Sequence, residues 1–230
     1  MRSLFDCKEE LHSCSKCGLC QSVCPIYKIT GNDCTVSRGH FIMLRGFIKG
    51  ELKMSRTINR YLDLCLKCGA CSKFCPSGID VVDIVALAKA EYFKSHVLEK
   101  VFSFFQKYIL FGLLPKLLNI LKRKLKSQKF DKKVVYFGGC SSGISGNKHI
   151  IKILNSCGVE VITPNFDCCG IPFFTRGDMK TFEEQARKYF NKLKKTGVYE
   201  VVTNCSSCEK TIKSYTKWFG FEGYTVKNVF

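Results

Sequence analysis

Residues 14–25 read CSKCGLCQSVCP, and residues 65–76 repeat the pattern as CLKCGACSKFCP. Both stretches fit CxxCxxCxxxCP, with the glycine after the second cysteine in register. Three thiolates at this spacing allow one tight loop to bind three corners of a cuboidal metal cluster. The glycine tolerates a close backbone approach, and the proline is expected to keep the loop from continuing into a helix. The repeat therefore predicts a metal-binding domain in the first third of the chain.

The overall composition supports metal or redox chemistry. The chain has 230 residues, of which 16 are cysteine, with a hydrophobic share of 46% and a formal net charge of +18. This hydrophobic share excludes a disordered or collagen-like chain. Residues 1–10 contain no apolar run long enough for the core of a signal peptide. We therefore expect a cytoplasmic protein, in which thiols stay reduced and do not form a disulfide framework.

The order of the cysteines predicts which of them bind together. In two-cluster ferredoxins of this spacing, the fourth cysteine of each motif binds the other cluster. Structural zinc sites are the alternative, because CxxC is also a zinc spacing, but the ordered quartets ending in proline favour clusters. We expect one 4Fe-4S cluster on Cys14, Cys17, Cys20 and Cys75, and a second on Cys65, Cys68, Cys71 and Cys24.

The segments around the motifs predict helices. Residues 38–45 have an amphipathic pattern after Ser37, a candidate N-cap. Residues 80–89 have a second helical pattern, with Asp80 as the candidate N-cap and Asp83 in the first turn. The sequence therefore predicts an α-helical two-cluster domain over residues 1–96.

The following segment, residues 97–132, is predicted to be a basic amphipathic helical linker. Residues 88–133 contain twelve Lys or Arg against three acidic residues. No apolar stretch here reaches the roughly eighteen residues that a membrane-spanning helix needs. Its apolar face is expected to pack on the protein or on a partner subunit, and binding to an anionic membrane surface stays open as an alternative. No nucleic-acid-binding motif is present, so nucleic acid is not an expected partner.

Residues 133–230 have the alternating pattern of an α/β domain. Strands are predicted at 134–137, 159–162 and 200–203, and helices at 144–157, 180–195 and 206–218. Strands that alternate with helices predict a small parallel sheet. The fold class expected for the whole chain is therefore α+β multidomain, with the helical ferredoxin domain followed by this small α/β domain.

Cysteines follow each predicted strand of this second domain, where the carboxyl ends of parallel strands meet at one edge. Adjacent cysteines suit a multi-iron cluster better than one tetrahedral zinc. We expect a third metal site, a cluster or zinc, on Cys140, Cys168, Cys169, Cys205 and Cys208.

Two CxxCxxCxxxCP motifs, a helical link and a C…CCG…CxxC domain resemble the iron-sulfur subunits of the glycolate oxidase, lactate-utilisation and anaerobic glycerol-3-phosphate dehydrogenase families. These families share the cysteine-rich CCG domain of heterodisulfide reductase. The specific matches are Cys24-Pro25-Ile26-Tyr27, Arg38-Gly39 and Cys168-Cys169-Gly170. The resemblance implies that the third site holds a non-cubane 4Fe-4S cluster.

The resemblance also implies a function. The chain would relay electrons from a flavoprotein dehydrogenase, acting on a 2-hydroxy acid or glycerol 3-phosphate, toward a quinone or another acceptor. Such a protein could sit peripherally on the cytoplasmic face of a membrane. The chain alone would then perform no substrate catalysis. The alternative is a thiol/disulfide redox enzyme like heterodisulfide reductase, with the chemistry at the CCG site.

The sequence differs from the family pattern in one respect. Family members carry two cysteine-rich repeats, and here one is present before the sequence stops in an apolar run at Phe230. This ending is expected of a truncated or split gene product, although a genuine one-repeat protein stays open.

The remaining cysteines and histidines are expected to be structural. Cys7, Cys34 and Cys157 fit no motif and are predicted to be small buried hydrophobic residues. The four histidines form no cluster in sequence, and His40 and His96 are predicted at surface positions on helices.

Overall fold

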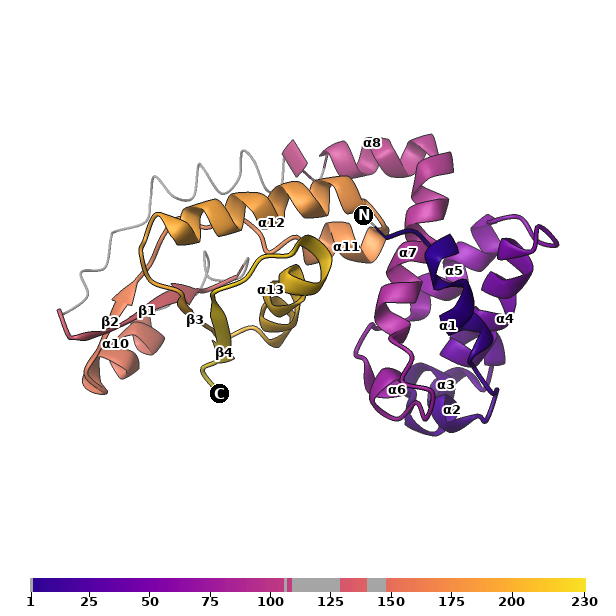
Figure 1. The fold of residues 1–230 in the computed structure, drawn as a ribbon, viewed down its shortest axis with the longest axis horizontal. Coiled ribbons are helices and arrows are strands. Elements are labelled where there is room, and N and C mark those ends of the chain that lie inside the picture. The colour runs from indigo at the N-terminus through magenta and orange to yellow at the C-terminus, as the bar shows by residue number, and fades with distance from the viewer. Residues whose placement is uncertain (1, 106, 109–128, 140–147) are drawn as a thin grey trace. The chain divides into compact units, whose positions relative to one another are not determined.

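The computed structural model describes residues 2–105, 107–108, 129–139 and 148–230 (Figure 1). The chain divides into two compact units. Unit 1 comprises Met1–Glu99 with Thr175–Asp178, and unit 2 comprises Lys100–Phe174 with Met179–Phe230. Each unit is described by itself below.

Unit 1 is built from short helices around one central helix. Helix α7 (Val81–Ser95) forms the core, since Ile84, Val85 and Ala88 are fully buried. The predicted cap is confirmed, because the Asp80 carboxylate accepts a hydrogen bond from the Asp83 amide at 3.5 Å. The elements before it are η1 (Phe5–Cys7), α1 (Lys8–His12), α2 (Leu19–Val23), α3 (Pro25–Thr30), η2 (Asp33–Thr35), α4 (Ser37–Ile48), α5 (Arg56–Leu64) and α6 (Ala70–Lys73). Helix α8 (Val97–Phe105) follows, and it belongs to unit 2 from Lys100 onward.

Two local predictions were wrong. Pro25 does not prevent a helix but opens α3 as its first residue, where its missing N–H costs nothing. Ser37 is not the N-cap of α4: the N-cap is Val36, which has no side-chain cap, and Ser37 is the first helical residue. The Ser37 hydroxyl is therefore not used for capping.

Helix α4 packs closely against η2 at a glycine. A Cβ on Gly39 would lie 2.0 Å from the carbonyl oxygen of Asp33 and 2.9 Å from the Cα of Cys34. Only a residue without a side chain permits this approach of two backbones. Gly39 thus fixes where α4 lies relative to the chain that follows the first cysteine motif.

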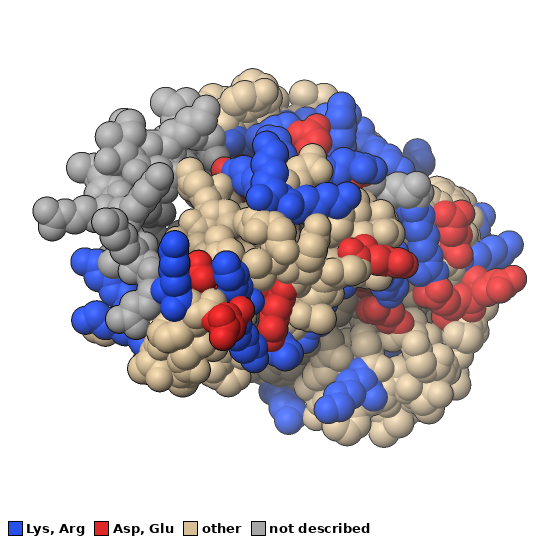
Figure 2. Space-filling view, turned by 60° about the vertical axis from the view of Figure 1, so that its left-hand side comes forward, with Lys and Arg blue, Asp and Glu red and all other residues tan. Residues whose placement is uncertain are grey.

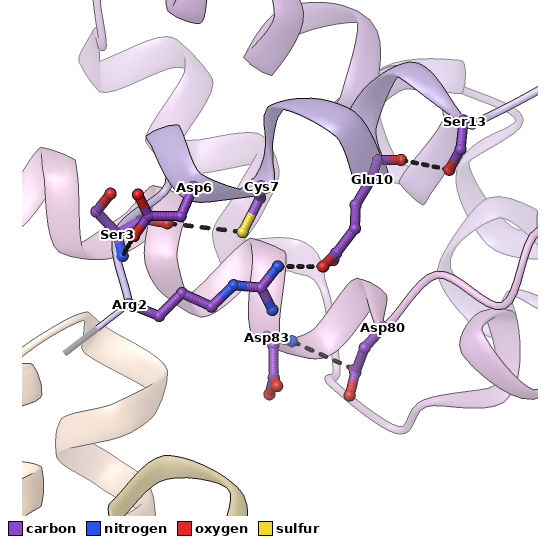
Figure 3. A network of polar contacts seen from close by, with 8 residues as sticks. All are labelled: Arg2, Ser3, Asp6, Cys7, Glu10, Ser13, Asp80 and Asp83. Carbon is purple, nitrogen blue, oxygen red and sulfur yellow. Dashed lines mark hydrogen bonds and ion pairs between the residues drawn. The ribbon is translucent and has the colours of Figure 1, made fainter.

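The N-terminal segment is fixed to the same unit by the polar network in Figure 3. Arg2 pairs with Glu10 of α1, and the Ser3 amide donates to Asp6 at 2.7 Å. The buried Cys7 thiol donates to the Ser3 carbonyl at 3.6 Å. Cys7 is therefore a structural residue, as predicted.

Unit 2 contains a four-stranded sheet in the order β2-β1-β3-β4, with every strand pair parallel. The predicted fold class, a helical part followed by a small α/β part, is confirmed. Residues 144–147 of the predicted helix 144–157 lie outside the described residues. The elements are β1 (Lys132–Phe137), α10 (Lys148–Ser156), β2 (Val159–Ile162), α12 (Met179–Lys194), β3 (Glu200–Thr203), α13 (Ser206–Phe219) and β4 (Thr225–Asn228). Helix α11 (Ile171–Arg176) starts in unit 2, and its last two residues belong to unit 1.

The core of unit 2 is partly aliphatic and partly aromatic. Val134, Ile151 and Val161 belong to one apolar cluster of the sheet and α10. Phe137, at the end of β1, packs edge-on against Tyr189 of α12 with ring centroids 5.3 Å apart. Tyr189 in turn contacts Tyr215 of α13 at 5.8 Å. This aromatic group lies beneath the cysteines that follow the strands.

The predicted linker of residues 97–132 is described only in part, because residues 106 and 109–128 lie outside the described residues. Within its described part, α8 exposes Leu98, Phe102 and Phe105, the first with 85% of its surface accessible. None of the described helices is long and apolar enough to cross a membrane. Lys and Arg cover more of the face shown in Figure 2 than Asp and Glu do.

Candidate metal centres

The two cysteine motifs repeat their backbone conformation as well as their sequence. Lys16 and Gly18 have φ of 59° and 86°, and Lys67 and Gly69 have φ of 54° and 80°. Lys16 and Lys67 are the non-glycine residues with positive φ among the described residues. A loop that alternates into the left-handed region turns successive amides toward one side and forms a concave site for anions. The positive φ at Lys16 and Lys67 is strained backbone. Amides that this conformation turns toward the cavity give the strain a functional reason.

Each loop closes around its own cavity, and each cavity has the four thiols that the spacing predicts. We define the Cys14 cavity by Cys14, Cys17, Cys20 and Cys75 in its wall. We define the Cys65 cavity by Cys24, Cys65, Cys68 and Cys71. The fourth cysteine in each wall comes from the other motif. The assignment of these thiols as ligands stays a prediction.

Hydrogen bonds fix the cysteine loops to the helices. Arg45 of α4 donates to the carbonyl oxygens of Leu11 and Cys14, the second at 3.0 Å. The Ser77 hydroxyl, just beyond the second motif, donates to the Ser13 carbonyl at 3.0 Å, just before the first. The Ser77–Ser13 hydrogen bond therefore joins the ends of the two motifs.

Helix α4 forms a wall of both cavities. Ser37, Cys71 and Val81 line both, while Arg38 and Phe41 line the Cys14 cavity and His40 lines the Cys65 cavity. His40 was predicted at the surface, and this was wrong: only 1% of it is exposed. The periodicity of α4 predicts which face is apolar and buried. It does not predict that α5 packs against α4, so it could not predict the burial of His40.

The buried polar atoms on this wall lack partners. Neither ring nitrogen of His40 nor the Ser37 hydroxyl forms a hydrogen bond within the described residues. Burial lowers the pKa of His40 to about 4, although the backbone of Tyr61 opposes this shift. His40 is therefore neutral in this structure and has one N–H to donate.

Burial also raises the pKa of the thiols in the Cys65 cavity. It raises the pKa of Cys71 to about 11, with the Ser37 hydroxyl opposing the shift, and it raises the pKa of Cys65 against the backbone and charge of Lys67. Burial in turn lowers the pKa of Lys67. Because a metal ligand must be deprotonated, the cavity disfavours free thiolates and favours thiolates that a cation neutralises.

The third cysteine group lies at the carboxyl edge of the parallel sheet. Cys169 Sγ and Cys208 Sγ are 3.4 Å apart, and the Gly170 amide donates to Cys168 Sγ at 3.3 Å. Cys205 is the N-cap residue of α13, so the CxxC segment surrounds the N-terminus of that helix. The structure thus brings Cys168, Cys169 and Cys208 together as buried thiols, with Cys205 half-buried beside them.

Cys140, the fifth predicted ligand, lies outside the described residues. Its neighbour Gly139 has φ of 69°, and a Cβ there would be 3.4 Å from Cys208 Sγ and 3.8 Å from the Cβ of Cys205. The described segment that precedes Cys140 therefore ends beside Cys205 and Cys208.

The thiols of Cys169 and Cys208 have pKa values that are shifted in opposite directions. Hydrogen bonds with Cys168 and Cys208 hold the pKa of Cys169 well below its usual range, and the contact with Cys169 raises the pKa of Cys208. Of the two thiols, Cys169 is therefore the one whose surroundings favour the thiolate. The Tyr215 hydroxyl donates to the Cys169 carbonyl at 2.5 Å and fixes the backbone beneath this thiol.

The donor sets fit iron-sulfur clusters. Among the described residues, no three Cys, His, Asp or Glu side chains are placed to hold a single metal ion. A cuboidal cluster does not require such convergence, because each thiolate binds a different iron. The amide-lined loops and the buried polar atoms of Ser37 and His40 would face the sulfurs of such a cluster.

The cysteines outside these sites differ from one another. Cys7 is buried, as predicted, and burial raises its pKa to about 11. Cys34 is only partly buried, and Cys157, at the end of α10, is exposed. The prediction for Cys157 was wrong, because its helix ends at the surface before Gly158.

Comparison with known families gives two matches along the chain. A 4Fe-4S dicluster domain matches residues 10–79, and a cysteine-rich domain matches residues 134–213. The predicted resemblance and the prediction of two 4Fe-4S clusters are thus confirmed, and the second match favours a further cluster. No solved structure matches the chain.

Three relatives, named as iron-sulfur proteins or as oxidoreductase subunits, match most of the chain. It is 30% identical to an uncharacterized iron-sulfur protein of Methanocaldococcus jannaschii, over 93% of this chain and 46% of that protein. It is 24% identical to a probable glycolate oxidase iron-sulfur subunit of Bacillus subtilis, over 90% and 59%. It is 25% identical to one of the subunits of the dihydromethanophenazine:CoB–CoM heterodisulfide reductase of Methanosarcina mazei, over 89% and 57%. The chain spans about half the length of these relatives.

Proposed function

Because the chain joins a 4Fe-4S dicluster domain to a cysteine-rich domain, we propose that it is an iron-sulfur electron-transfer subunit. It relays electrons from a flavoprotein dehydrogenase of the 2-hydroxy-acid or glycerol-3-phosphate type toward a quinone or another acceptor. The observation that carries this proposal is the pair of cysteine-lined cavities that share the wall of Ser37, Cys71 and Val81. Two redox sites with a common wall suit the transfer of single electrons between them.

In this proposal the chain's residues have distinct roles. Cys14, Cys17, Cys20 and Cys75 hold one cluster, and Cys24, Cys65, Cys68 and Cys71 hold the other. Cys168, Cys169, Cys205 and Cys208, together with Cys140, hold a third. When bound, the clusters supply one-electron redox chemistry. The rest of the chain excludes water and sets the electrostatics.

The partner and location are part of the same proposal. One relative is named as part of glycolate oxidase and another as part of heterodisulfide reductase, so both work in complexes. Helix α8 exposes Leu98, Phe102 and Phe105 beside Lys100, a composition suited to a partner protein or an anionic membrane surface on the cytoplasmic side. Cosedimentation with anionic but not neutral vesicles would support the membrane location, and equal binding to both would contradict it.

The test is the content of iron, sulfide and zinc in anaerobically purified protein, with EPR of oxidised and reduced samples. About twelve irons per chain are expected for three four-iron clusters, with a signal in the oxidised sample from the third site. About eight irons with zinc in the second unit would restrict the relay to the dicluster domain. Protein without iron after anaerobic reconstitution would contradict the proposal.

A second function is favoured by the Cys169–Cys208 pair. Two sulfurs 3.4 Å apart, with the pKa of one of them lowered by its neighbours, are suited to thiol–disulfide exchange. The chain would then reduce a disulfide substrate with two electrons and two protons, giving two thiols. Turnover of a disulfide by the isolated, chemically reduced chain, lost in Cys169→Ser, would favour this enzyme. The absence of turnover in iron-replete protein would favour the relay.

A further inference from the structure

Helix α4 begins at the wall between the two cavities. Its first residue, Ser37, lines both cavities, as Cys71 does. The first amides of a helix have no intrahelical partner, so this end carries a partial positive charge. An anionic group bound in either cavity is therefore stabilised by the start of α4.

The Ser37 side chain is a second, independent observation at this place. Ser37 is 5% exposed, and its hydroxyl has no hydrogen-bond partner within the described residues. A serine before a helix would satisfy its hydroxyl by capping, but Val36 occupies the N-cap position here. Because buried polar groups in native proteins almost always find a partner, the hydroxyl needs one in the cavity.

Cys71 is suited to be that partner. Ser37 and Cys71 line the same two cavities, so the buried hydroxyl and this sulfur belong to one wall. A neutral thiol is a weak acceptor, whereas a hydrogen bond to an ionised group is short and strong. Binding to metal deprotonates a cysteine. The hydroxyl therefore gains a strong acceptor when Cys71 becomes a ligand.

We propose that the Ser37 hydroxyl donates a hydrogen bond to Cys71 Sγ in the cluster-bound protein and thereby raises the reduction potential of the cluster in the Cys65 cavity. This inference rests on the proposed function, which makes Cys71 a ligand. Hydrogen bonds to the sulfurs are among the factors that set cluster potentials, because they stabilise the more negative, reduced state. Ser37 acts through Cys71 and is a positioning residue. It biases which of the two clusters holds the electron.

The test is an EPR-monitored redox titration of the full-length Ser37→Ala protein. The signals of the two cavities are assigned beforehand with Cys17→Ser and Cys68→Ser. The reduction equilibrium of the cluster in the Cys65 cavity is expected to become about tenfold less favourable, which is about 59 mV for one electron. Ser22→Ala is the matched control, because Ser22 is exposed and donates to the Leu19 carbonyl at 2.8 Å. It is expected to leave both potentials unchanged.

Ser37→Thr retains the hydroxyl and is expected to retain the native potential. In the native protein, electron–nuclear double resonance should detect a proton at this cluster that exchanges in D2O and is absent from Ser37→Ala. An unchanged potential in iron-replete Ser37→Ala would overturn the inference but leave the proposed function intact. The same holds if Ser37→Thr shifts the potential as far as Ser37→Ala does. If Ser37→Ala loses its iron, its potential cannot be compared, and the native protein provides the test. The absence of an exchangeable proton at this cluster in the native protein would overturn the inference. Native protein without iron would instead defeat the proposed function.

Discussion

At the scale of single residues, the positive φ angles in the two motifs separate a binding role from a folding role. Gly18 lies in the wall of the Cys14 cavity, with φ of 86°, and Gly31 ends α3 outside both cavities, with φ of 60°. A side chain in the left-handed region costs about 1–2 kcal/mol at either position. Only Gly18 also shapes the loop that faces the predicted ligands.

Gly18→Ala and Gly31→Ala are therefore expected to lower the free energy of unfolding of the apoprotein by similar amounts, about 1 kcal/mol. Iron content is expected to fall only in Gly18→Ala, by up to about four irons, because one cluster is affected. Urea unfolding of the apoprotein and iron analysis of the holoprotein measure the two effects. Equal iron loss in both variants would mean that strain alone, rather than the cavity, explains the glycine.

The thiols outside the sites allow a prediction about reactivity. Burial raises the pKa of Cys7 from 9.0 to about 11, and Cys157 is exposed. At pH 8 this shift reduces the thiolate fraction of Cys7 about a hundredfold, and burial adds steric protection. In the holoprotein, iodoacetamide should label Cys157 rapidly and Cys7 slowly, with the Cys7 rate rising as the pH approaches 11.

Peptide mapping by mass spectrometry at several pH values measures both rates. Urea-unfolded protein is the control, in which both cysteines should react alike. If native Cys7 reacted as fast as Cys157 at pH 8, the packing of η1 and α1 described above would be wrong.

At the scale of elements, the close approach of α4 and η2 positions the polar wall of the cavities. At Gly39 an added Cβ would meet the backbone of Asp33 at 2.0 Å, whereas at Gly46 it would meet the flexible side chain of Leu52 at 2.8 Å. Backbone atoms cannot move without shifting η2, but a leucine can change rotamer. Gly39→Ala is expected to cost about 3 kcal/mol of stability or more, and Gly46→Ala about 1 kcal/mol or less.

Both variants gain equally from replacing a helical glycine with alanine, so their difference reports the packing. Urea denaturation of the apoprotein gives the two values, and the titration described for Ser37 shows whether the wall has moved. A stability loss at Gly46 as large as that at Gly39 would contradict the assigned contact.

The elements that the sequence predicted best are those ended by local signals. Helix α12 (Met179–Lys194) and helix α13 (Ser206–Phe219) lie within one residue of their predicted ends, because Gly197 and Gly220 follow them. Cysteine spacing likewise predicted that the first three cysteines of each motif face one cavity, since this rule is local to the loop. The burial of His40 and the free hydroxyl of Ser37 depend on segments distant in sequence, which periodicity cannot register.

At the scale of the whole molecule, two compact units each have a core and a cysteine group of their own. Unit 1 is centred on α7, and unit 2 on the parallel sheet. Each unit keeps its cysteines in place with hydrogen bonds that use no metal, such as Arg45 to the Cys14 carbonyl and Tyr215 to the Cys169 carbonyl. Loss of metal from one unit is therefore not expected to unfold the other.

Cys17→Ser should accordingly remove or alter the EPR signal of one cluster in the reduced protein and leave the signal of the second unit. Cys168→Ser should do the reverse. The physical reason is that the ligands of each site come from one unit, so a lost thiolate weakens only the metal that it binds. Iron per chain should fall by about four at most in either variant. Loss of all iron from a single substitution would show that the units assemble their metal cooperatively.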